Sequence, residues 1–162
     1  IVKDPRVGAS QADLEGQFAL LAEVRDKVTA LHAGLTKIRS VRGSLDEWVK
    51  RAEGHRVAAT VVEKADAIKA KLAPIEAELI PVKTSDKPSA GRLPPRLNDE
   101  LLHLAGVIAS ADWAPNTQSR ALYQETAAAV DDSLARLQAV LDKDVREFGE
   151  YIQEFGISPI KA

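Results

Sequence analysis

Few residues in this chain have types and spacings that suggest chemistry. Glu100-Leu-Leu-His103 has the Glu-x-x-His spacing of di-iron helical bundles, which need a second copy of the motif and further glutamates around one cavity. The other two histidines, His32 and His55, do not follow a glutamate by three residues, so there is no second copy. We therefore interpret His103 as a surface or boundary residue and expect no metal site.

Other catalytic patterns are also incomplete. Asp142-Lys-Asp144 resembles the start of a calcium loop, but no glycine stands at the sixth position and helical periodicity continues through it. The chain has no cysteine, which excludes disulfides, thiolate metal ligands and cysteine nucleophiles. Glycine-rich phosphate loops and nucleophile elbows are absent from the sequence. We expect a protein that is not an enzyme and that holds no cofactor.

Charge and tryptophan leave open an interaction role. The 22 basic and 24 acidic residues are interspersed, so we expect no nucleic-acid binding. Between residues 37 and 56, basic and acidic side chains alternate; we interpret them as intrahelical pairs, with a basic docking patch as the alternative. Trp48 and Trp113 are the candidate interface residues, because tryptophan is enriched at interfaces. The other interpretation is that each fills one end of a bundle.

The apolar pattern predicts long helices that position these residues. Only 4% of residues are aromatic, so the core must be aliphatic, as in helix-on-helix packing. Ser10 begins a capping-box-like sequence, and a heptad register then runs to Ala52. Gly43 predicts a kink or short break in this helix, which should end at Gly54. No apolar segment is long enough to span a membrane.

Three further helices are predicted: about 56–80, bent near Lys71 by Pro74; about 95–111; and one helix from 116 or 117 to about 155. We expect a short extended segment over residues 1–9, a helical bundle over 10–162, and a long loop at 81–95. The predicted fold class is all-α: an elongated antiparallel bundle of three to four helices, two long and two short. The two short helices together match one long helix, so they should cover the third side, with a four-helix up-down bundle as the alternative.

Arg42 and Asp144 occupy a or d positions of long helices, where charges are unusual. Unpaired burial of a charge is costly, so we predict that each lies near a bundle end or pairs with an opposite charge.

Three segments carry a resemblance: Asp4-Pro-Arg-Val7 leading to Phe18, the stretch from Pro95 to Pro115, and Ser119-Arg-Ala-Leu-Tyr123. They resemble the C-terminal region of bacterial sortilin-like (VPS10-type) proteins with BNR-repeat β-propellers, often labelled glycosyl-hydrolase-like. The resemblance implies a secreted or periplasmic parent whose glycan or peptide chemistry belongs to the propeller. It assigns no site residue to this chain.

These observations favour a non-catalytic structural or interaction module. The absence of methionine and the start at Ile1 also lead us to expect that the chain is part of a larger protein. Its partner would be the parent propeller or another protein, and the sequence leaves the oligomeric state open. The alternative is a free-standing helical binding protein for a small ligand or a partner helix, with a groove opened near Pro74 and the 81–95 loop.

Overall fold

The structure, a computed structural model, describes residues 8–81 and 95–156. Its elements are α1 (Gln11–Arg51), α2 (Ala58–Leu79), α3 (Leu97–Ile108), α4 (Thr117–Val140), a π-helical turn η1 (Leu141–Val145) and α5 (Arg146–Glu154). The described part contains no strand, which confirms the predicted all-α class. Most of the predicted extended segment and of the 81–95 loop lies outside the described residues.

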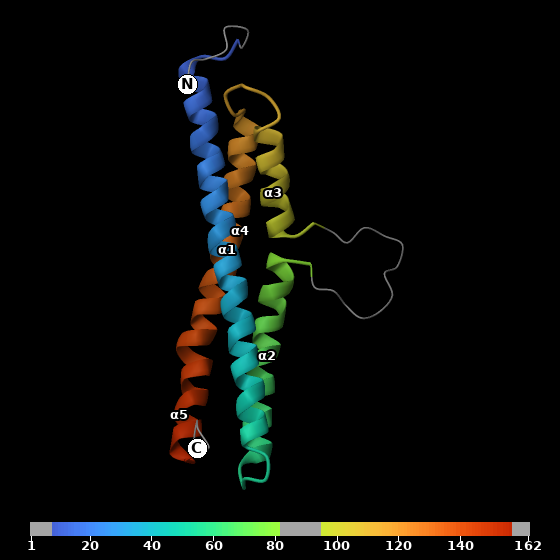
Figure 1. Cartoon of the computed structure of the whole chain (residues 1–162), viewed down its shortest axis with the longest axis vertical. Coiled ribbons are helices and arrows are strands. Elements are labelled where there is room, and N and C mark those ends of the chain that lie inside the picture. Colours follow the sequence, from blue (N-terminus) through green and yellow to red (C-terminus); the bar gives the residue numbers. More distant parts are fainter. Residues whose placement is uncertain (1–7, 82–94, 157–162) are drawn as a thin grey trace, which may run out of the picture.

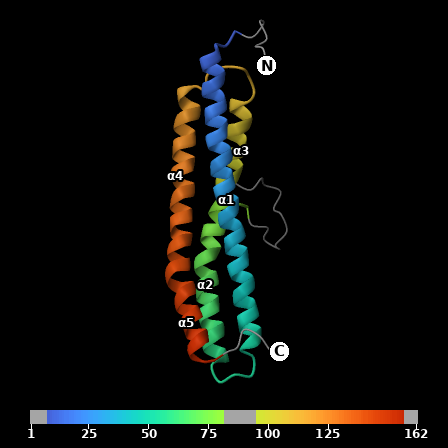
Figure 2. The same cartoon turned by 60° about the vertical axis from the view of Figure 1, so that its left-hand side comes forward.

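The bundle has three sides along its length. α1 forms one side and α4, η1 and α5 form the second, with both running in the same direction (Figure 1). α2 and α3 lie end to end, antiparallel to both, and make up the third side (Figures 1 and 2). α1 and α4 each pack against both short helices, whereas α2 and α3 touch little. This is the arrangement of two long helices covered by a short pair that the helix lengths predict.

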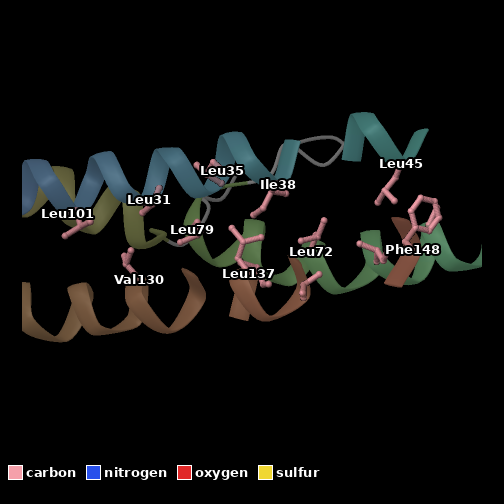
Figure 3. Close-up of a cluster of buried hydrophobic side chains, with 14 of the residues drawn as sticks. Leu31, Leu35, Ile38, Leu45, Leu72, Leu79, Leu101, Val130, Leu137 and Phe148 are labelled. Atoms are coloured by element: carbon pink, nitrogen blue, oxygen red, sulfur yellow. The ribbon is translucent and has the colours of Figure 1, made fainter. Parts of the chain in front are cut away.

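One aliphatic core runs the length of the bundle. Figure 3 shows Leu101, Leu31 and Val130 meeting at one part of it and Leu45 beside Phe148 at another, with Leu72 between the two groups. All six are buried, and the predicted a and d positions of α1 are buried or half-buried. At about 25 cal/mol per Å² of apolar surface, this continuous burial is the main stabilising term. Among the described helices, none is long and apolar enough to cross a bilayer.

α1 begins where the sequence predicts and does not break at Gly43. Ser10 Oγ accepts a hydrogen bond from the Asp13 amide at 3.1 Å, and Asp13 Oδ2 accepts one from the Ser10 amide at 2.8 Å. Of the kink or short break predicted at Gly43, the break is wrong, because α1 continues through Gly43 to Arg51. Burial of Ile38 and Leu45 on either side outweighs the roughly 1 kcal/mol that an internal glycine costs. Gly54, with φ of +79°, lies in the turn that follows.

Pro74 lies inside α2, as predicted. Proline has no N–H, so the carbonyl of Ala70 loses its helical partner. Both Ala70 and Pro74 are exposed, and water can satisfy that carbonyl. The helix therefore tolerates this proline on its solvent side.

The last helix departs from its prediction at η1. The sequence predicts one uninterrupted α-helix to about residue 155, but the structure has a π turn at Leu141–Val145 within it. The π turn inserts one residue and so rotates everything after it. As a result Ile152 is buried, and Tyr151 and Phe155 are half-buried, with their ring centroids 4.7 Å apart and their planes tilted by 48°.

The two charges at core positions are paired, which confirms that prediction. Arg42 donates to the carboxylate of Glu76, a buried residue of α2 that also lies 3.7 Å from Arg39. Asp144, in η1, accepts from Lys71 Nζ at 2.7 Å. Both pairs join neighbouring helices, so the charges at these positions hold the register between sides of the bundle.

Candidate interaction surface

The residues that suggested metal chemistry do not come together. His103 is exposed on α3, and His32 Nε2 lies 3.0 Å from the Asn98 side-chain oxygen instead of a carboxylate. Asp142 accepts from Gln138 Nε2 within one helix, whereas Asp144 faces Lys71. In the described residues there is no group of three or more histidine and acidic side chains that could hold a metal ion.

A groove of about 340 Å³ lies where α2 and α3 meet along α4, and several of its polar residues pair with one another. Glu78 of α2 and Arg136 of α4 form an ion pair in this groove. Ser133 Oγ donates a hydrogen bond to the Glu78 carboxylate at 3.0 Å. The hydrogen bond from Arg136 is the main reason that the pKa of Glu78 lies below its usual value, and the hydroxyl of Ser133 adds to it. These contacts link α2 to α4.

The basic stretch of α1 is largely used inside the molecule. Arg39 and Arg42 face Glu76, and Arg51 lies 3.7 Å from Glu47. Beyond the helix, the guanidinium of Arg56 lies over the Phe155 ring, 5.6 Å from its centre. Only the Arg51–Glu47 pair lies within α1, as predicted, whereas Arg39 and Arg42 pair with α2. Both kinds of pair favour paired side chains over a basic docking patch.

The two tryptophans have different surroundings. Trp48 is half-buried, packs against the core, and has the Arg51 guanidinium 5.0 Å above its ring. Trp113 lies in the turn between α3 and α4 and is 64% exposed. Trp48 therefore belongs to the packing of one end, while Trp113 is a large aromatic side chain offered to solvent at the other.

The turn that carries Trp113 is held in place. Gln17 of α1 is buried and its Nε2 donates to the carbonyls of Ile108 and Ala111, at 2.6 Å each. The Asn116 side chain accepts from the amide of Ser119 at 2.7 Å and so caps α4. Because both ends of the turn are fixed, Trp113 projects from a defined backbone.

Further exposed apolar side chains lie in the same half of the bundle. Of the six large ones in the described part, only Val62 belongs to the other half. The other five come from the start of α1, from α3, from the turn after it and from the start of α4: Phe18, Leu102, Val107, Trp113 and Leu122. We call these five residues the apical apolar set.

Of this set, only Trp113 is a candidate interface residue on sequence grounds. The signal for the others was available, since apolar residues outside a heptad register fall on the solvent side of a helix. Phe18, one place after the buried Gln17, is such a residue and is 72% exposed.

No protein-family model matches the chain, and neither the curated proteins nor the solved structures include a match. The relation to sortilin-like propeller proteins therefore stays an expectation from the sequence.

Proposed function

We propose that this chain is a non-catalytic structural and interaction module that docks onto a protein partner through its apical apolar set. The observation that carries the proposal is Trp113, which is 64% exposed on a turn fixed by Gln17 and Asn116. A tryptophan in solvent contributes little to folding, whereas in an interface it is among the side chains that contribute most.

The surroundings of Trp113 support this role. Exposed apolar side chains scattered singly are ordinary, but clusters on one part of a surface mark interaction sites. Four other exposed apolar side chains share its half of the bundle. The α1 backbone and the hydrogen bonds of Gln17 give these residues a rigid support, so little ordering is required on binding.

The identity of the parent rests on the resemblance alone. In this proposal the module belongs to a larger secreted or periplasmic protein with a propeller, and the partner is that propeller or another protein.

The test compares the stability of Trp113→Ala and Trp48→Ala by urea unfolding. Trp113→Ala should change the free energy of unfolding by less than about 0.5 kcal/mol, as expected of a surface position. Trp48→Ala should cost about 2 kcal/mol or more, because the ring packs on the core. A comparable loss for Trp113→Ala would show that Trp113 holds the fold together and would contradict the proposal.

The alternative is a helical binding protein for a small ligand or a partner helix. The groove at the α2–α3 junction is the observation that favours it, since Arg96 and Arg136 both line it. A small ligand there would shift the backbone amide signals of these two residues in NMR spectra and leave Trp113 unchanged. Docking through the apical set gives the opposite pattern.

A further inference from the structure

After its first turn, which carries Asp99 and Glu100, α3 has no charged residue on either face. Residues 101–111 include no aspartate, glutamate, lysine or arginine. Its inner face buries Leu101, Leu104 and Ile108, yet Leu102 and Val107 are 52% and 47% exposed. A helix that is apolar all round is normally covered all round. The outer face of α3 therefore has the composition of a contact surface.

Gly106 lies in the middle of that outer face. At about 100° per residue, Leu102 and Val107 stand about 140° apart, and Gly106 falls between them with His103 and Ser110. All five residues are exposed, and a Cβ added to Gly106 would have no atom within 4 Å. A glycine inside an exposed helix costs roughly 1 kcal/mol relative to alanine, but it lets another backbone approach closely.

Apolar side chains of the neighbouring helices flank this face. Gly16 of α1 faces α4, because a Cβ there would lie 3.6 Å from Arg120, and Gln17 faces α3. Phe18, the next residue round the helix, is on the side away from α4. Leu122 precedes Ser133 by three turns of α4, so the two side chains lie on the same side of that helix. Ser133 contacts Glu78 of α2, so this side faces the short helices.

The charge of this half of the molecule indicates the partner. The contacts His32–Asn98 and Lys27–Asp131 cross the bundle near its middle and divide it into two halves along its length. On the side of α3, residues 8–32 and 96–131 hold nine acidic and four basic side chains, a net charge of −5. Residues 33–81 and 132–156 hold 13 acidic and 12 basic, a net charge of −1. Two copies meeting at α3 would repel, whereas a basic partner would be attracted.

We propose that the outer face of α3 binds an amphipathic helix of a partner protein, with apolar side chains toward Gly106 and lysine or arginine at its edges. This inference rests on the proposed function and specifies its partner. α3 is about 18 Å long, which matches a partner helix of about 12 residues. A contact of this size is small, so we expect an affinity on the order of micromolar or weaker.

The test uses the whole chain labelled with 15N and a 14-residue model peptide made only of leucine and lysine in a helical amphipathic pattern. The matched peptide has glutamate in place of lysine. The leucine–lysine peptide should shift the amide signals of Leu102, Gly106 and Val107, and the leucine–glutamate peptide should bind at least about tenfold more weakly. Lower affinity at higher salt should accompany binding.

Two glycine variants distinguish binding at the outer face of α3 from general attraction of the peptide to the charge of the protein. Gly106→Gln fills the open space with a neutral side chain and favours the helix, so lost binding cannot come from unfolding. Gly43→Gln is the matched control, because Gly43 is also an exposed helical glycine with no atom within 4 Å of an added Cβ. We expect at least a tenfold loss of affinity for Gly106→Gln and no change for Gly43→Gln.

Three results would overturn the inference. These are no binding of the leucine–lysine peptide at millimolar concentration, equal affinity of the two glycine variants, and self-association that Gly106→Gln abolishes. The last result would make a second copy the occupant. The proposed function fails separately, through a large loss of stability in Trp113→Ala.

Discussion

Replacing Gly43 by alanine should stabilise the protein. Gly43 lies inside α1, is exposed, and has open space where a Cβ would stand. Glycine to alanine in an exposed helix interior gains about 1 kcal/mol, mainly because alanine restricts the unfolded chain more. For a chain of this size that gain raises the thermal midpoint by roughly 2–4 °C. Calorimetry and urea unfolding of the same preparation measure both quantities.

Gly34→Ala is the control in the same helix. A Cβ at Gly34 would lie 2.5 Å from Leu134 Cδ2, well inside the normal contact distance between carbon atoms of about 3.5–4.0 Å. Overpacking of this kind costs about 1–3 kcal/mol, which exceeds or cancels the gain in helix propensity. Gly34→Ala should therefore be neutral to destabilising, by up to about 2 kcal/mol after that gain is subtracted.

The refuting result is a loss of stability for Gly43→Ala. A helix that ended at Gly43 in a left-handed conformation would penalise alanine by about 1 kcal/mol or more. That outcome would restore the break at Gly43 that the sequence predicts and would divide α1 into two helices.

Two further variants test the interhelical pairs. Arg42→Met should lower the free energy of unfolding by about 1–3 kcal/mol in urea, because the buried Glu76 carboxylate keeps only the more distant Arg39 as a partner. The double variant with Glu76→Leu should recover most of that loss, since no charge is then left buried without its partner. No recovery in the double variant would contradict a pairing role. Glu78→Gln should cost at most about 1 kcal/mol at pH 7, since the side chain is partly exposed. The pKa of Glu78 is lowered in the folded state, so its contribution is present above the unfolded pKa and is lost as the pH falls through the folded pKa. The difference between wild type and Glu78→Gln should therefore disappear under acidic conditions, and a difference unchanged by acid would show that the carboxylate charge is not responsible.

The helical architecture could be predicted from the sequence because its main signal is periodic. Apolar residues at heptad spacing determined which face of α1 is buried, and the relative helix lengths favoured two short helices end to end. The same register identified Arg42 and Asp144 as charges that require partners. Their partners, Glu76 and Lys71, could not be named, because pairing depends on how the sides of the bundle are shifted along each other.

Local features were predicted less well. Gly43 carries both a helix-stop signal and a place in the heptad register, and only the tertiary packing decides between them. The π turn at Leu141–Val145 has no simple sequence signature, so the rotation that buries Ile152 was missed. Trp48 and Trp113 look equivalent in the sequence, and their difference appears only when the fold places one on the core and the other on a turn.

Small-angle scattering coupled to size exclusion and light scattering tests the central claim most directly. A self-contained module with a free α3 face predicts a monomer of 17.5 kDa. Its longest dimension should be at least about 60 Å, since a helix as long as α1 rises by ~1.5 Å per residue. A dimer, or a compact particle much shorter than this, would contradict the account, because the apical apolar set would then be covered by a second copy or by the chain itself.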